Sequence, residues 1–136
     1  MVTMEFEIIA DVKKTAQITE KFYKRGADWV NALPKKEKER VLNDFWEGAV
    51  PNVIHGKEVI LPENQEELLG WFVITIDAVN DGHDMMEKQK EEIGAPDQGF
   101  LNVITAVREI SGLIGERLGI VRQVPEKGAA RRGVNG

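Results

Sequence analysis

The apolar positions in the second half of the chain follow a helical repeat over two long segments. In the first, the repeating positions are Leu69, Phe72, Ile76, Val79, His83 and Met86. In the second, they are Ile104, Val107, Ser111, Ile114, Leu118 and Val121. Alternating spacings of three and four residues place each set on one helix face, as in helices that pack against another helix along their length. The pattern therefore predicts two long amphipathic helices.

Capping signals mark the ends of these two helices. Asn64 can cap the first, with Glu67 three residues later completing a pair of the capping-box type. That helix is expected to end near Ile93, because a glycine and a proline follow. Asp97 can cap the second helix, which is expected to cover residues 98–121. The short connection between the two helices predicts an antiparallel hairpin.

The N-terminal segments give weaker signals. Residues 4–8 alternate apolar and acidic side chains, which is typical of a half-buried strand but also fits the first turn of a helix. Residues 11–32 are expected to be helical, because their apolar positions lie near one stripe. Gly26 weakens the middle of this segment and is a candidate break.

A second N-terminal helix is expected to begin at Pro34, which suits a first helical turn. It covers residues 35–46 and is expected to stop at Gly48 and Pro51. Residues 52–61 contain two short β-rich runs around a turn-like sequence, which predicts a β-hairpin. Because an isolated hairpin is marginal, this one should pack on helices or pair with the strand near the N-terminus.

Together these elements predict a mainly α fold with a small β-hairpin. We expect an N-terminal lobe at residues 1–62, a helical hairpin for oligomerisation at 63–124 and a flexible basic tail at 125–136. The last helix has more apolar positions than one partner can cover, and three glycines on it are typical of close backbone approach. Self-association is therefore expected, with a purely intramolecular core as the alternative. The candidate oligomerisation residues are Leu69, Phe72, Ile76, Val79, Met86, Ile104, Val107, Ile114 and Leu118.

The net charge of −5 is unevenly distributed. Residues 1–50 carry nine basic and nine acidic side chains, residues 51–100 carry three and eleven, and residues 101–136 carry six and three. The acidic middle would repel phosphates, so nucleic-acid contact is expected only from the two ends of the chain. The candidate contact residues are Lys13, Lys14, Lys24, Arg25, Arg131 and Arg132.

The chain has no cysteines, which excludes disulfides and a thiol nucleophile. No secretory signal or membrane-spanning run is apparent, so we expect a cytoplasmic protein with no membrane partner.

Residues able to support catalysis are few. Asp77, Asp81 and Asp84 share one helix face, where carboxylates could hold magnesium as in helical nucleotide pyrophosphohydrolases. Those enzymes need a facing acidic pair, and the next helix offers only Glu109 and Glu116, so a solvated helix face is the favoured interpretation. A polar residue on a seam, such as the histidine at position 83, more often sets helix register than performs chemistry. No phosphate loop, dinucleotide fingerprint or hydrolase motif is present, so we expect neither catalysis nor a cofactor.

Between Leu68 and Lys127 the chain combines a long helix, a short break and a second helix with a distinctive ending. The relevant residues are Gly94-Ala95-Pro96-Asp97, Phe100-Leu101-Asn102, Ala106, Arg108-Glu109-Ile110, Leu113-Ile114-Gly115 and Leu118-Gly119-Ile120. This stretch resembles the helical oligomerisation region of small terminase subunits from tailed bacteriophages. The resemblance covers rather less than half of the chain.

The resemblance implies a DNA-packaging protein without catalytic activity of its own. Its subunits would form a ring through these helices, recognise double-stranded viral DNA and regulate the large terminase. The tail with Lys127, Arg131 and Arg132 would reach the motor or the DNA. The family places a helix-turn-helix domain N-terminally, and this sequence shows no clear turn of that kind before residue 50.

The sequence thus leads to a viral DNA-packaging or assembly protein as the first hypothesis. A small phage-type regulatory protein that inhibits a protein partner through the acidic middle is the alternative. A magnesium-dependent nucleotide hydrolase built on Asp77, Asp81 and Asp84 is the third.

Overall fold

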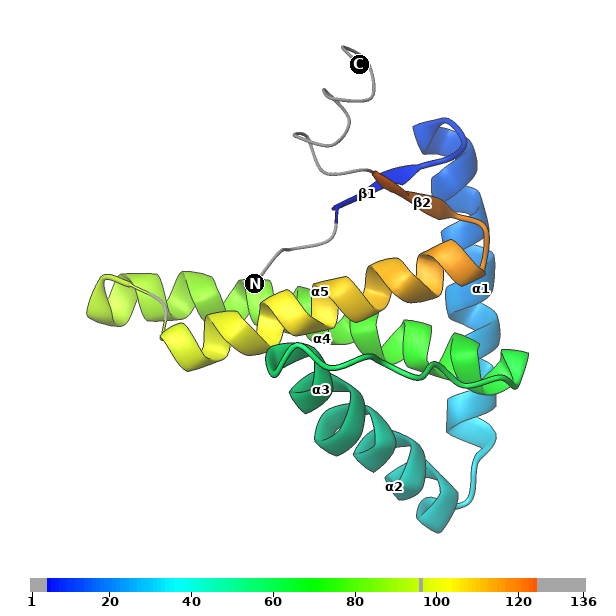
Figure 1. Ribbon diagram of the computed structural model, residues 1–136, viewed down its shortest axis with the longest axis horizontal. Coiled ribbons are helices and arrows are strands. Elements are labelled where there is room, and N and C mark those ends of the chain that lie inside the picture. The colour runs from blue at the N-terminus through cyan, green and yellow to red at the C-terminus, as the bar shows by residue number, and fades with distance from the viewer. Residues whose placement is uncertain (1–4, 96, 125–136) are drawn as a thin grey trace.

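The computed structural model describes residues 5–95 and 97–124 and is mainly α, as predicted. Its elements in chain order are β1 (Glu5–Ile8), α1 (Val12–Ala32), α2 (Lys35–Asn43), the π-helix η1 (Asp44–Ala49), α3 (Val50–Ile54), α4 (Gln65–Ile93), α5 (Gln98–Arg117) and β2 (Val121–Val124). Figure 1 shows α4 and α5 side by side, with α1 crossing at one end and α2–α3 packed on one side. Within the described ranges, no helix is long and apolar enough to cross a membrane.

The α4–α5 hairpin has the predicted capping residues at the starts of both helices and at the end of α4, although the Glu67 side chain does not complete the capping box. The side chain of Asn64 accepts a hydrogen bond from the backbone N–H of Glu67 at 3.0 Å, and Gly94 ends α4 in the left-handed region with φ of 82°. The side chain of Asp97 accepts from the N–H of Phe100 at 3.1 Å. These local contacts explain why the sequence located three of the four helix ends.

The C-terminal end of α5 differs from the prediction. The helix stops at Arg117 and not near residue 121, because Gly119 adopts a φ of 78° and turns the chain away. The residues that follow form β2, which pairs antiparallel with β1, placing Glu7 opposite Arg122. The nearby Arg122 Nε also donates to the Glu7 carboxylate at 2.6 Å. The sheet therefore joins the two ends of the described chain.

The predicted β-hairpin at residues 52–61 is wrong. Residues Val50–Ile54 form α3, and the rest of the segment is an extended connection without strand pairing. Its Val59 and Leu61 are partly buried against the core, whereas Ile60 between them is 84% exposed. The β-rich alternation thus reflects one face packed on helices, which requires no ladder of backbone hydrogen bonds.

The predicted helix stops at Gly48 and Pro51 are also wrong. The chain stays helical from α2 through η1 into α3, with the N–H of Val50 donating to the carbonyl of Phe45, five residues back. A π turn inserts an extra residue into the helix, and in this chain it ends two residues before Pro51, which has no N–H to donate. Gly48 and Pro51 therefore lie where one continuous helical segment changes from π to α geometry.

Gly26 does not break α1 but lets it approach α4. A Cβ atom at this position would lie 2.3 Å from the carbonyl oxygen of Leu69, closer than any real contact. On the facing helix, a Cβ at Gly70 would lie 2.8 Å from the ring of Trp29. The crossing of these two helices therefore depends on glycine from both sides.

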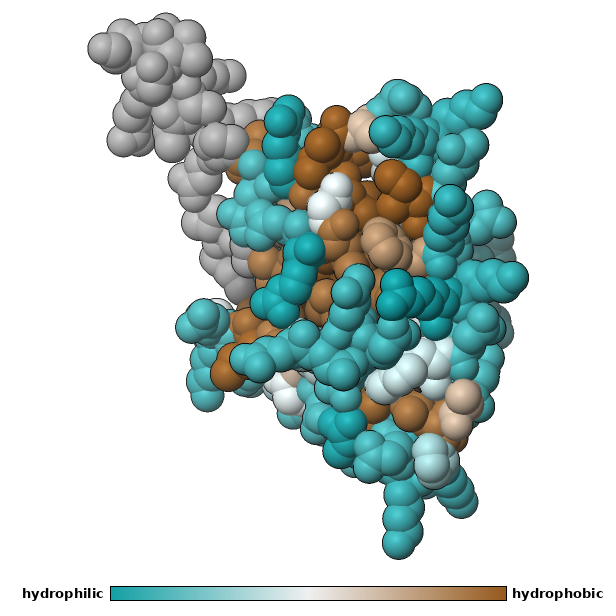
Figure 2. Space-filling model, turned by 90° about the vertical axis from the view of Figure 1, so that its right-hand side faces the viewer, coloured by the Kyte–Doolittle hydropathy of each residue, from teal (hydrophilic) through white to brown (hydrophobic). Residues whose placement is uncertain are grey.

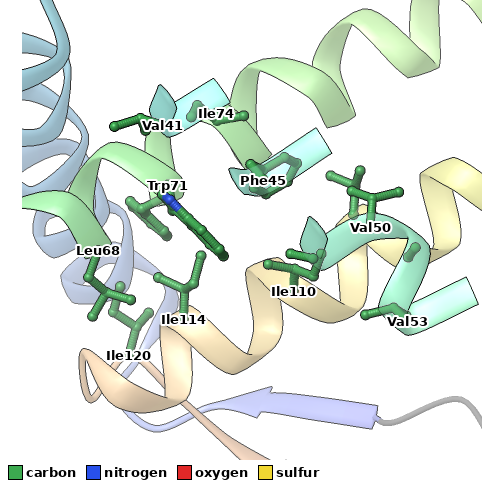
Figure 3. Packing of buried hydrophobic residues seen from close by; sticks show 14 residues of the cluster. Val41, Phe45, Val50, Val53, Leu68, Trp71, Ile74, Ile110, Ile114 and Ile120 are labelled. Carbon is green, nitrogen blue, oxygen red and sulfur yellow. The ribbon is translucent and has the colours of Figure 1, made fainter. Parts of the chain in front are cut away.

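One core joins the helices across the predicted domain boundary at residue 62. Figure 3 shows its side chains pointing inward from α2, η1, α3, α4 and α5. The members at most 1% exposed in this cluster are Val41, Phe45, Ala106, Val107, Ile110 and Ile114. The edge of the Phe45 ring meets Trp71, with ring centroids 5.5 Å apart. The N-terminal lobe and the helical hairpin therefore share their hydrophobic stabilisation.

Replacing Gly26 by alanine is expected to destabilise the fold by at least about 2 kcal/mol, because the new methyl group would meet a backbone carbonyl that cannot move alone. The free energy of unfolding from urea titration measures the effect. Gly48→Ala is the matched control: nothing lies within 4 Å of its Cβ position, so stability should stay the same or rise by up to about 1 kcal/mol. Equal stability of the two variants would contradict the close crossing.

Candidate functional site

The outer part of the α4–α5 hairpin extends past the other helices (Figure 1). We call residues 77–95 and 97–101 the hairpin arm. Its α4 part contains a single buried residue, Gly82, over which the side chain of Ile104 lies. Met85 and Ile93 on this arm are 51% and 69% exposed. The arm is thus a two-helix layer that keeps large apolar side chains in solvent.

The candidate oligomerisation residues divide into two groups. The first group is buried in the core of the chain itself and consists of Leu69, Phe72, Ile104, Val107 and Ile114. The second is partly exposed and consists of Ile76, Val79, Met86 and Leu118. The first group has no free surface to offer a neighbouring subunit. Of the second, Val79 and Met86 lie on the hairpin arm.

The glycines of α5 serve contacts within the chain. The ring of Phe6 on β1 occupies the space where a Cβ of Gly112 would be, and Val121 lies 3.0 Å from the Cβ position of Gly115. Gly119 provides the left-handed turn at the helix end. The groups that approach Gly112 and Gly115 are side chains of the two strands and not another backbone, so these glycines carry no argument for self-association.

The carboxylates of α4 do not form a metal centre. In the part of the chain that the structure describes, no group of three or more His, Asp or Glu side chains is arranged to hold a metal ion. Asp77 instead accepts a hydrogen bond from the Tyr23 hydroxyl at 2.6 Å, while Asp81 and Asp84 are exposed. The three share one helix face, as predicted, and this face is acidic and solvated.

His83 was expected on the helix seam, where it would set the register. The structure exposes it, with Nε2 3.1 Å from the guanidinium of Arg108 on α5. The buried position at this level of the arm belongs to Gly82. A polar side chain at the seam is therefore not needed, because close packing of Ile104 over a glycine holds the two helices together there.

The candidate cations lie in different surroundings. Lys13, Lys14 and Lys24 are exposed on α1, whereas Arg25 forms an ion pair with Glu66 of α4. Arg131 and Arg132 lie outside the described residues. The lysines of α1 therefore form the available basic surface among these candidates.

Arg40 is the centre of the most connected charge cluster among the described residues. Its guanidinium contacts Glu67 at 2.7 Å, Asp44 at 3.0 Å and Glu37 at 3.2 Å. The hydrogen bonds to Glu67 and then Glu37 raise the pKa of Arg40 above its ordinary value. The cluster connects α2 to the start of α4. The carboxylate of Glu67 therefore faces Arg40 on another helix instead of completing the capping box.

A groove of about 710 Å³ lies beneath the sheet, between α1 and the hairpin. Its apolar walls include Phe6, Phe72 and Ile76, and its polar groups include the hydroxyl of Thr105 and the carboxylate of Glu109, which is 6% exposed. These groups come from segments more than a hundred residues apart, so periodicity could not have indicated the groove. The groove is therefore lined mainly by apolar side chains with a few polar groups among them.

A second hollow of about 540 Å³ lies between η1 and the extended connection. Trp71 borders it, and the Nε1 atom of this residue has no hydrogen-bond partner among the described residues. Asn43 and Asn52 also line the hollow. Room and polar neighbours of this kind suit an ordered water molecule.

The hydrogen bond between Tyr23 and Asp77 should be visible in an alkaline titration. Together with desolvation, it raises the pKa of Tyr23 above 10, because the neutral hydroxyl donates the bond and a phenolate would face a carboxylate. The stabilisation is present below the ordinary pKa and is lost as the pH rises through the raised value. Tyr23 is the only tyrosine, so tyrosinate absorbance reports it alone. Asp77→Ala should lower this pKa toward 10, and Asp81→Ala should leave it unchanged; equal titration of both variants would contradict the contact.

Comparisons with protein-family models, with curated proteins and with solved structures find no match for this chain. Function must therefore be inferred from the surfaces described above. The features that the fold leaves exposed include the apolar side chains of the hairpin arm, its acidic face and the lysines of α1.

Proposed function

We propose that the protein is a non-catalytic assembly protein that forms a homo-oligomer through its hairpin arm. Its specific role, on this proposal, is that of a DNA-packaging adaptor similar to small terminase subunits. The observation that supports assembly is the arm itself, which keeps Met85 and Ile93 in solvent where the hairpin extends past the other helices (Figure 1).

The energetics favour covering these side chains. Full burial of a methionine or isoleucine side chain contributes about 1.5–3 kcal/mol. Partly exposed neighbours on the arm, including Val79 and Met86, would add contact area. Because the arm is only two helices thick, a second copy can contact it without disturbing the core.

The DNA-packaging role is supported by the resemblance between residues 68 and 127 and the oligomerisation region of small terminase subunits. Lys13 and Lys14, which are exposed at the start of α1, supply the cations proposed to contact phosphates. Such binding would be independent of sequence and would weaken as salt increases. The large terminase is the proposed partner of the assembled ring.

The solution mass of the purified chain tests the proposal. Light scattering is expected to give a multiple of 15.3 kDa, and the double variant Met85→Glu, Ile93→Glu is expected to dissociate toward the single-chain mass. Ile60→Glu is the control, since this side chain is 84% exposed and belongs to the connection between α3 and α4, outside the arm. Both variants change exposed positions, so circular dichroism should show unchanged helix content.

A wild-type chain of 15.3 kDa at all concentrations would contradict the proposal and favour a regulatory protein with a different partner. An oligomer that survives the arm variant but not the control would place the interface elsewhere and contradict the role of the arm.

A further inference from the structure

Two helices at opposite ends of the molecule, α1 and the outer part of α4, carry opposite net charges (Figure 1). α1 holds five basic side chains, Lys13, Lys14, Lys21, Lys24 and Arg25, against two acidic ones. The α4 part of the hairpin arm holds six acidic side chains, Asp77, Asp81, Asp84, Glu87, Glu91 and Glu92, against two basic ones. Figure 1 places α1 at one end of the long axis and the loop of the hairpin at the other.

Each charged end also exposes apolar side chains. At the α1 end, Ile8, Ile9 and Val12 are 41%, 54% and 75% exposed. Figure 2 shows this side of the molecule, where apolar residues gather in the upper half of the face among hydrophilic side chains. On the arm, Met85 lies one helical turn from Asp81, so an apolar and an acidic group are neighbours. Each end thus exposes apolar side chains, and its long helix carries an excess of charge of one sign. At the α1 end, Glu5, Glu7 and Asp11 flank the apolar residues in sequence, so the basic excess belongs to α1 itself.

A symmetric contact between two arms would bring twelve carboxylates together, six from each copy. Like charges facing each other across an interface cost several kcal/mol, and opposite charges steer association. A symmetric contact between two α1 helices would be opposed by their lysines for the same reason. Contact between unlike ends avoids both costs.

We propose that the hairpin arm of one copy docks on the α1 end of the next copy. This proposal rests on the proposed function and names the surface that the arm meets. The acidic face of α4 then lies against Lys21 and Lys24, which are exposed on α1, and the apolar groups at the two ends cover one another. Because the contact joins different surfaces, every copy keeps one free end, and repetition gives a closed ring or an open filament.

Charge reversal tests the contact. One variant carries Lys21→Glu with Lys24→Glu, and a second carries Asp81→Lys with Asp84→Lys; all four positions are exposed. Each variant alone should raise the subunit dissociation constant more than about tenfold, because like charges then meet. The chain with all four changes should regain assembly, since the signs are exchanged and complementary again. Analytical ultracentrifugation at low protein concentration measures these constants.

A matched control reverses two lysines outside α1. Lys35→Glu with Lys36→Glu changes the same net charge on the exposed start of α2 and should leave the dissociation constant within about twofold of wild type. The attraction between unlike ends should also weaken as salt is raised, because exposed charges are screened.

The outcomes separate this contact from the proposed function. A wild-type oligomer whose dissociation constant is unchanged in both reversal variants overturns the contact between unlike ends and leaves self-assembly intact. Loss of assembly in each variant without recovery in the fourfold variant also overturns it. A wild-type monomer overturns self-assembly itself.

Discussion

The close crossing of α1 and α4 is the constraint on which the rest of the structure depends. Gly26 lies directly over the backbone of Leu69, so the two helices approach more closely than side chains would allow. This approach encloses the first half of α4, where residues 68–75 are buried all round. α5, η1 and α3 then pack on the opposite side of α4 and on one another. Without the crossing, the central helix would keep one exposed apolar face.

The same constraint explains the unequal halves of the hairpin. Near its open end, α4 is surrounded by other elements, and hydrophobic burial there stabilises the whole fold. Beyond Asp77, the outer half of α4 meets only α5 in the described structure and retains Met85 and Ile93 in solvent. On the proposal above, the α1 end of a second copy covers this half. Stability and assembly would thus use different parts of one helix.

The strands at the two chain ends have a structural role of their own. β1 and β2 pair over α5, with the ring of Phe6 resting on Gly112, and form one wall of the large groove. A two-stranded sheet is marginal alone, but here each strand is held by helix contacts as well as by its partner. The groove is consequently a product of chain closure and is lined by residues from both ends of the described sequence.

The sequence by itself determined the elements whose signals are local. The caps Asn64 and Asp97 and the terminator Gly94 act within a few residues, so their interpretation needed no knowledge of the fold. The three–four repeat also predicted the hairpin, since periodicity reports that one face of a helix is covered. It could not say by what, and only tertiary structure assigned Leu69 and Val107 to the internal core while leaving Met85 exposed. The partner of β1, the continuity of the helix through Pro51 and the use of Gly26 were likewise decided in three dimensions. These three features depend on contacts between segments distant in sequence or on a change of helix type. Such contacts and changes produce no repeating pattern of apolar residues along the chain.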